Sequence, residues 1–248
     1  MRFLTIKNAD FTYQGKQAVI SDVNLDITKG EFHCLLGKSG CGKTTLLKLA
    51  SGLLQPDKGI IQLDGKELDG PYQECGFMFQ SPTLLEWKTV IDNILLPIFL
   101  KRKVTEEDRK HAAGLLDMVG LSEHHNRYPA QLSGGQQSRV SLARALIQHP
   151  SMLFLDEPFA ALDAITREEL QEDLLKICQL HQTTVLFITH DIAEAVYLSD
   201  RISVMDRGRI IYEQNVLLKK PRLLNMRYGS YFNNLCLALR QKMSEGHL

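Results

Sequence analysis

Near its N-terminal end the sequence contains a glycine-rich loop, Gly37-Lys38-Ser39-Gly40-Cys41-Gly42-Lys43-Thr44, that few folds can accommodate. It satisfies the GxxxxGK[ST] pattern in full, after the apolar segment 32–36 and before three leucines that predict a helix. Glycines let successive backbone N–H groups converge on phosphates, and the helix N-terminus adds a favourable dipole. Lys43 would supply a positive charge for the β- and γ-phosphates, and the Thr44 hydroxyl is placed for Mg²⁺. The loop predicts binding of a magnesium nucleotide, but alone it does not separate kinases, GTPases and motor ATPases.

A pair of adjacent acids narrows that choice. Asp156 and Glu157 follow the apolar segment 152–155, which predicts a buried strand. An Asp at the carboxyl end of such a strand can hold Mg²⁺ through water. Glu157 has no metal to coordinate in that scheme, so it is better suited to orient or deprotonate the water that attacks the γ-phosphate. The plainer interpretation is two solvated carboxylates at a strand end.

Composition excludes some classes of function. Lys plus Arg equals Asp plus Glu at 29 each, so no basic excess indicates nucleic-acid binding. The five cysteines are scattered without a CxxC pair, which is typical of free thiols in a reducing compartment. No window reaches the roughly 18 to 20 apolar residues that span a bilayer, and the start of the chain lacks a signal-peptide pattern. We therefore expect a cytoplasmic protein.

The hydrophobic pattern changes along the chain. Near-alternating apolar residues between positions 4 and 27 predict strands, followed by short strands at 32–36, 60–63 and 76–79. We expect His33, inside one of these strands, to be a neutral, hydrogen-bonded core histidine. Segment 81–150 predicts helices only; one begins with a capping box at Thr105 and Asp108 and ends at Gly120. The elements expected beyond it are a strand at 152–155, a helix at 164–180, a strand at 184–189, a helix at 192–198 and a strand at 202–205.

Strands that alternate with helices predict an α/β fold with a mostly parallel sheet, into which a helical block is inserted. We expect one domain, with a nucleotide-binding core at 1–80 and 151–213, a helical subdomain at 81–150 and a short tail at 214–248. In the tail, the spacing of Tyr231, Leu235, Ala238 and Leu239 predicts one amphipathic helix.

The segment Leu132-Ser133-Gly134-Gly135-Gln136 resembles the LSGGQ signature of ABC transporter ATP-binding subunits. Val140-Ser141-Leu142-Ala143-Arg144-Ala145-Leu146 fits the SxARAL pattern that follows it, in a helix expected over 139–147. The plainer interpretation, a Ser-Gly-Gly helix cap, is itself an anion site. The resemblance implies that Ser133, Gly134, Gly135 and, less firmly, Gln136 contact the ATP of a partner copy.

Further residues resemble functional positions of that family, in the family's order. Tyr13 resembles the aromatic residue that stacks on adenine, and Gln80 the glutamine that links Mg²⁺ and water to the helical block. Asp163, in Ala161-Leu162-Asp163, resembles the D-loop at the dimer seam, and His190 the switch histidine that hydrogen-bonds the γ-phosphate. The alternative without a function is that Tyr13 is an ordinary strand tyrosine and that Gln80 and His190 are polar residues at strand ends. Lys38 and Ser138 depart from the pattern, where many relatives have proline and a basic residue.

The predicted site has three sets of residues. The catalytic set is Glu157, His190 and Gln80. The Mg²⁺ set is Thr44, Gln80 and Asp156. The nucleotide-binding set is Tyr13, Gly37, Ser39, Gly40, Cys41, Gly42, Lys43, Thr44, Thr45, Ser133, Gly134, Gly135, Gln136 and Asp163.

The resemblance also implies a fold and partners. The fold is a P-loop ABC ATPase core with a mostly parallel sheet, an N-terminal antiparallel β subdomain and an inserted helical subdomain. One chain cannot complete a site, so two copies are expected to close head to tail around ATP and Mg²⁺. The other expected partners are transmembrane permease subunits and a substrate-binding protein, with no nucleic acid. The location implied is peripheral, on the inner face of the cell membrane.

The segment 82–90, with Asn93, resembles the same stretch in nitrate, sulfonate, taurine and thiamine-precursor importers. Those relatives tend to carry Leu-Leu-Pro-Trp, and Glu86 replaces the proline here. With residues 94–100, this segment is expected to form a groove that receives the permease, with Trp87 as a contact; simple packing of the helical block is the alternative.

A subunit of an ABC exporter or lipoprotein-releasing complex is the main alternative. DNA-repair relatives need a long coiled-coil insertion, translation-type relatives carry two cassettes in one chain, and a P-loop kinase would not explain LSGGQ.

Overall fold

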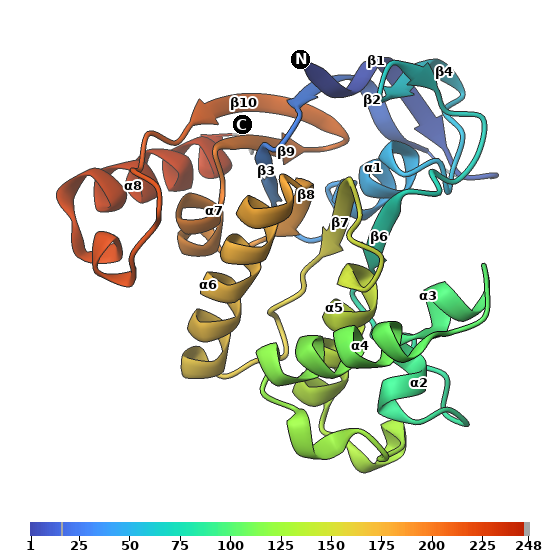
Figure 1. Cartoon of the computed structure of the whole chain (residues 1–248). Helices are drawn as coiled ribbons and strands as arrows, with labels where there is room; N and C mark the ends of the chain where they lie inside the picture. The colour runs from blue at the N-terminus through green and yellow to red at the C-terminus, as the bar shows by residue number, and fades with distance from the viewer. Residues whose placement is uncertain (16, 246–248) are drawn as a thin grey trace. The chain divides into compact units, whose positions relative to one another are not determined.

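The computed structural model describes residues 1–15 and 17–245, which form two compact units (Figure 1). We call Met1–Gln73 with Thr184–Leu248 the phosphate-loop unit, and Glu74–Thr183 the helical unit.

An antiparallel sheet opens the phosphate-loop unit, with strand order β2-β1-β4-β5. Apolar residues of the central strand lie opposite apolar partners, as Ile6 pairs with Leu25 on one side and with Ile61 on the other. All three are buried, so one face of this sheet contributes to the core. The strands are β1 (Arg2–Thr12), β2 (Ala18–Thr28), β4 (Lys58–Leu63) and β5 (Lys66–Glu67).

The second sheet of this unit is mostly parallel, in the order β10-β9-β3-β8. β3 pairs in parallel with β8 and β9, while β10 is antiparallel to β9. Every residue of β3 and β8 is buried, which explains their nearly continuous apolar sequences. The strands are β3 (Phe32–Gly37), β8 (Thr184–Thr189), β9 (Arg201–Asp206) and β10 (Arg209–Asn215).

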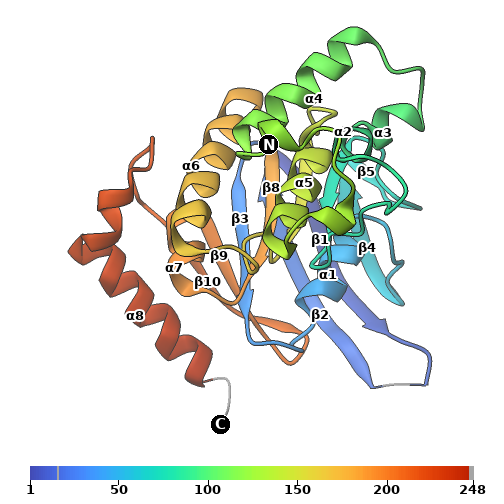
Figure 2. The same cartoon turned by 90° about the horizontal axis from the view of Figure 1, so that it is seen from below.

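Helices pack on this sheet, and α8 is the last element of the described chain. α7 packs on β3 and β8, and α8 packs in turn on α7 and β9 (Figure 2). The bounds are α1 (Lys43–Ala50), α7 (Ile192–Leu198), the short η3 (Leu224–Tyr228) and α8 (Ser230–Glu245).

His33 is fully buried in this unit and fully hydrogen-bonded. Its Nδ1 lies 2.9 Å from Glu31 Oε1, and its Nε2 lies 2.9 Å from Ser203 Oγ. Burial lowers the pKa of His33, so the ring is neutral as predicted. Burial alone would raise the pKa of Glu31, but hydrogen bonds from His33 and Thr28 outweigh it and lower this pKa to about 2.

The helical unit has two parallel strands, β6 (Cys75–Met78) and β7 (Met152–Asp156). α5 is its central helix and contacts α2, α4 and β6. The remaining elements are α2 (Val90–Ile94), α3 (Leu96–Phe99), α4 (Glu106–Met118), η1 (Ser122–His124), η2 (Pro129–Gln131), α5 (Gly134–Leu146) and α6 (Ala164–His181).

The predicted fold class is confirmed, and most predicted elements lie within a few residues of their observed bounds. Segment 81–150, described throughout, contains helices and turns but no strand. Thr105 and Asp108 form the predicted capping box, and Gly120 follows the helix with φ of 66°. The two compact units divide the chain at different points from the predicted domains, whose boundaries stay a prediction.

Three local predictions need correction. The signature helix begins at Gly134 and not near 139, because Ser133 caps it there. β10 was missed because its apolar residues form one short run, Ile210 to Tyr212, without alternation, and none of its residues is fully buried. The buried face of α8 contains Phe232, Leu235 and Leu239, whereas Tyr231 is 42% exposed.

Candidate nucleotide-binding site

The glycine-rich loop joins the end of β3 to the start of α1. Gly42 is the N-cap of α1 in a left-handed conformation, with φ of 107°. A Cβ atom at this position would lie 2.9 Å from the carbonyl oxygen of Val19. Both the left-handed φ and this close approach therefore require glycine. No side chain caps α1, and its first N–H groups therefore remain available to an anion.

Lys43 is the buried cation of this loop, with 6% exposure. Its ammonium donates hydrogen bonds to the carbonyl oxygens of Gly37, at 2.9 Å, and Lys38, at 2.8 Å. These bonds hold the charge inside the curve of the loop. Ser39 and Gly40 are exposed at its tip, where phosphate oxygens can reach them.

Several side chains in and beside the loop are buried or half-buried. Burial raises the pKa of the Cys41 thiol, which therefore stays protonated near neutral pH. Thr44 is half-buried, while Thr45 is buried and its Oγ1 lies 3.4 Å from the Tyr13 hydroxyl. The half-buried Tyr13 ring packs edge-on against Phe11, with ring centroids 4.9 Å apart.

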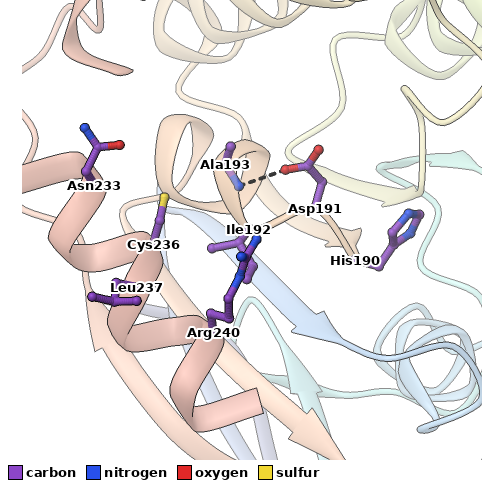
Figure 3. Close-up of a pocket in the computed structure, with 8 residues that line it drawn as sticks. All are labelled: His190, Asp191, Ile192, Ala193, Asn233, Cys236, Leu237 and Arg240. Atoms are coloured by element: carbon purple, nitrogen blue, oxygen red, sulfur yellow. Dashed lines mark hydrogen bonds between the residues drawn. The ribbon is translucent and has the colours of Figure 1, made fainter. Parts of the chain in front are cut away.

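His190 is exposed directly after β8. The next residue, Asp191, caps α7 by accepting hydrogen bonds from the backbone N–H groups of Ala193, at 2.8 Å, and Glu194, at 3.2 Å. A hollow of about 560 Å³ lies between this turn and α8 (Figure 3). Its lining residues are His190, Asp191, Ile192, Ala193, Asn233, Cys236, Leu237 and Arg240. No spacing pattern predicts that residues of α8 line the same hollow as this histidine.

In the helical unit, β7 delivers the acidic pair. Asp156 is the last residue of the strand and is 2% exposed. Glu157 is only partly buried and has φ of 49°, a left-handed conformation that turns the chain sharply after the strand. The two carboxylates therefore face different environments, as their different predicted roles require.

Gln80 is exposed just after β6, at the start of a tightly held loop. The side chain of Asn93 is fully buried beneath that loop. Its Nδ2 donates to the carbonyl oxygens of Leu85 and Lys88, each at 3.1 Å, and Thr89, at 3.0 Å; its Oδ1 accepts from the Leu85 N–H at 2.7 Å. This amide fixes the segment that follows Gln80.

The signature helix α5 begins with a reciprocal cap. The Gln136 N–H donates to Ser133 Oγ at 3.2 Å, and the Ser133 N–H donates to Gln136 Oε1 at 2.9 Å. Gln136 Nε2 also lies 3.3 Å from His124 Nε2. Ser133 and Gly134 are exposed. Sequence reasoning missed His124, because a contact made across a loop has no spacing pattern.

The predicted D-loop turn lies against this cap. A Cβ atom on Gly135 would come within 2.9 Å of the Ala161 carbonyl oxygen, so the two turns are in direct contact. Asp163 caps α6 by accepting a hydrogen bond from the Thr166 N–H at 3.0 Å. The hydrogen bonds with Thr166 lower the pKa of Asp163 and keep it ionised.

The predicted site residues divide between the two units. The phosphate-loop unit brings Tyr13 and residues 37–45 together and carries His190. The helical unit brings residues 133–136 against the turn at Ala161 and Leu162, directly before Asp163, and carries Gln80, Asp156 and Glu157. Their roles remain predictions.

A buried strand, a glycine loop and an uncapped helix start define a P-loop nucleotide-binding protein. The family model described as "ABC transporter" matches residues 20–160. The chain is 46% identical over 211 residues to the bicarbonate transport ATP-binding protein CmpD of Synechocystis sp., covering 83% of this chain and 75% of that protein. It is 49% identical over 199 residues to the nitrate import ATP-binding protein NrtD of Synechococcus elongatus, covering 79% and 73%.

A solved structure agrees with these matches. The dimeric ATP-binding cassette MJ0796, in a post-hydrolysis state with ADP and phosphate, superimposes with a TM-score of 0.81 at 32% identity. The match covers 87% of this chain and all of that one. This protein therefore belongs to the ABC transporter family as an ATP-binding subunit, and it is an ATPase. The resemblance to the nitrate importer group is confirmed. Among residues 1–15 and 17–245, no helix combines the length and the hydropathy of a membrane span.

Proposed function

We propose that this protein drives a bacterial importer of a small molecule, with a small oxyanion of the nitrate, bicarbonate or sulfonate kind as the favoured substrate class. The observation that carries the proposal is its 46% and 49% identity to bicarbonate and nitrate transport subunits over about four fifths of the chain. Its partners are a second copy, a membrane permease and a substrate-binding protein, which place it on the inner face of the membrane.

The phosphate groups of ATP are held from two sides. In one copy, the backbone N–H groups of the loop and the Lys43 ammonium contact the phosphates, while Tyr13 stacks on the adenine. In the partner copy, the Ser133 hydroxyl contributes. Because Ser133 Oγ already accepts the Gln136 N–H, its own O–H remains a donor for a phosphate oxygen. Asp163 adds a contact at the dimer seam.

Mg²⁺ fits the residues predicted to hold it. Thr44, Gln80 and Asp156 offer a hydroxyl, an amide and a carboxylate oxygen, the kinds of ligand this cation prefers. When bound, it would neutralise charge on the phosphates. Glu157 would accept a proton from the attacking water, and His190 would hydrogen-bond the γ-phosphate.

ATP then acts as the ligand that closes the dimer. Driving two copies from mostly open to mostly closed takes roughly 5.5 kcal/mol, so each of two nucleotides would supply about half. Loss of the γ-phosphate removes its contacts with Ser133, Gln80 and His190, and the dimer reopens.

A surface of the helical unit supports docking of the permease. Trp87 and Leu100 are each 74% exposed, and the residues beside them in the sequence, Lys88 and Phe99, line a hollow of about 500 Å³. Four basic side chains and one acidic side chain line this hollow, whose residues are Lys88, Asp92, Leu95, Phe99, Arg102, Lys103, Val104 and Arg109. Exposed aromatic and basic groups of this kind suit an acidic, amphipathic segment of a partner.

Substitution of Glu157 by Gln tests the ATPase assignment. The variant should bind ATP and accumulate as a dimer, because the ATP contacts remain while the base is lost; turnover should fall by at least about 100-fold. ATPase assays and size-exclusion chromatography measure this, with Glu107→Gln on the exposed start of α4 as control. Normal turnover in Glu157→Gln would remove that residue from the mechanism.

Transport by the reconstituted complex tests the direction and the substrate class. ATP-dependent uptake of labelled nitrate, bicarbonate or sulfonate is expected, and efflux without uptake would favour the exporter alternative.

A further inference from the structure

The loop after Gln80 contains a residue in an unfavourable conformation. Thr83 has φ of 47°, in the left-handed region that β-branched side chains rarely occupy. Such a conformation persists only where surrounding contacts impose it. The contacts at Thr83 are therefore informative.

Arg144, in the last turn of α5, makes those contacts. Its guanidinium donates hydrogen bonds to the carbonyl oxygen of Pro82 at 2.7 Å, to the carbonyl oxygen of Thr83 at 2.9 Å and to the Thr83 hydroxyl at 3.1 Å. A fourth bond, at 3.3 Å, reaches Ser141 Oγ on the same helix. The planar fork of arginine can bridge two successive peptide groups, which the single ammonium of lysine cannot.

The charge of Arg144 is not used in an ion pair. Burial lowers the pKa of this guanidinium, with no contribution from a carboxylate, and its hydrogen-bond partners among the described residues are the uncharged oxygens of Pro82, Thr83 and Ser141. A partly buried cation bonded only to neutral oxygens costs desolvation energy that a carboxylate partner would offset better. We therefore attribute the burial of Arg144 to its role in holding the loop at Pro82 and Thr83 in place.

Arg144 and the signature lie at opposite ends of one helix. α5 begins after the capped Ser133 and runs to Leu146, a helix of 13 residues without proline or any break. An uninterrupted helix is the kind of rigid element that can carry a displacement from one of its ends to the other. At its far end, Arg144 holds Pro82 and Thr83, which lie two and three residues after Gln80. These two residues begin the docking segment 82–90, which also contains the exposed Trp87. Asn93 fixes the same segment through its hydrogen bond to Leu85.

We propose that Arg144 is a positioning residue that transmits permease movement, by fixing the loop at Pro82 and Thr83 to the far end of the signature helix. A push on the docking segment then moves α5 and Ser133 together with Gln80. This inference rests on the proposed docking of a permease at that segment.

The experiment compares basal and permease-stimulated ATPase activity of the full chain, alone and with its cognate permease in lipid vesicles. Arg144→Gln removes the fork. It should bind ATP with a KM within about twofold of wild type, while permease-stimulated kcat falls by about tenfold. Arg144→Lys keeps the charge but not the fork, so it should lose stimulation too; it replaces Arg144→Gln if that variant does not fold. Arg209→Gln, on the exposed start of β10, is the control.

A second substitution distinguishes positioning from a general loss of structure. Thr83→Gly relaxes the left-handed conformation, so the loop depends less on the guanidinium. The effect of Arg144→Gln on stimulation should then shrink by several-fold in the Thr83→Gly background. Equal effects in both backgrounds, or a parallel loss of basal activity and thermal stability, would overturn the proposal.

Pull-down with the permease separates this inference from the function on which it rests. Arg144→Gln should retain the permease as wild type does, whereas Trp87→Ala should lose it. If wild-type protein retains no permease, the docking proposal fails and this one fails with it. If binding is intact and Arg144→Gln is stimulated like wild type, only the role of Arg144 is overturned.

Discussion

Two helices of this protein begin at glycine-rich turns, and they begin in opposite ways. α1 starts from Gly42, in a left-handed conformation and with no side-chain cap. α5 starts from Ser133, whose hydroxyl and backbone exchange hydrogen bonds with Gln136. The first helix leaves its N–H groups for a ligand, while the second satisfies its own and offers a hydroxyl.

The two turns also differ in burial. Gly42 is wedged against the carbonyl oxygen of Val19, and Lys43 beside it is buried. Ser133 and Gly134 are exposed. At the start of α1, a substitution should therefore lower stability and ATP binding together. At the start of α5, a substitution should lower ATP turnover much more than it lowers stability.

The largest effect is expected from Gly42→Ala. An alanine must adopt φ of 107° and place its Cβ 2.9 Å from a carbonyl oxygen. The variant should lose on the order of 1–3 kcal/mol of unfolding free energy and most of its ATP affinity together. Urea unfolding and equilibrium ATP binding measure both.

A matched glycine tests whether this reflects the position or the residue type. Gly114, inside α4, has open space around it, so Gly114→Ala should leave ATP binding unchanged and add up to about 1 kcal/mol of stability. ATP binding by Gly42→Ala at wild-type affinity would contradict the assigned role of this turn.

A smaller and more selective effect is expected from Ser133→Ala. Loss of the cap should cost about 1 kcal/mol of stability, and loss of the hydroxyl should lower turnover by at least about tenfold while one copy still binds ATP. Thr105→Ala is the matched control, because Thr105 caps α4 with the same capping-box geometry. Equal ATPase activity in the two variants would show that Ser133 is only a cap.

The smallest effect is expected from a fall in pH, which should destabilise the helical unit, which carries α5, before the phosphate-loop unit. The His149 ring stacks on the His111 ring there, with centroids 4.4 Å apart, and lies tilted against the His181 ring at 4.5 Å. Burial lowers the pKa of His111, with help from the other two rings, and burial with His181 lowers that of His149. Folded protein therefore binds fewer protons than unfolded protein, so stability is fully present above an unfolded pKa of about 6.5 and falls as pH drops toward the lowered values.

His33 in the phosphate-loop unit also has a lowered pKa, but it is fully buried and bonded at both ring nitrogens. Its protonation should need a larger opening of the structure. Between about pH 7.5 and about pH 5.5, hydrogen exchange, corrected for its intrinsic pH dependence, should rise more in α4 than in β3. His111→Phe, which keeps a ring that cannot be protonated, should reduce that rise. An equal rise in both elements would disprove the difference.

The sequence predicted those parts of the protein whose physics is local. The glycine spacing between positions 37 and 44 specifies a phosphate loop, and Thr105 with Asp108 specifies a helix start, because each effect acts within one turn. β10 was not predicted because its apolar residues form a run of only three, Ile210 to Tyr212, which shows no alternation, as an edge strand without a fully buried residue allows. The contact between Arg144 and Thr83 spans 61 positions and ends on a carbonyl oxygen, which every residue has. Such contacts depend on tertiary packing, which spacing does not encode.

The five cysteines have a practical consequence for labelling. All are free thiols, and burial raises the pKa of each, to about 11 for Cys75 and about 12 for Cys178. Because the thiolate is the reactive form, an exposed cysteine introduced elsewhere should react with maleimide first. Fluorescent dyes can then be attached at Gly114 of the helical unit and Arg209 of the phosphate-loop unit, so that the separation of the two units can be followed during turnover with every native cysteine left in place.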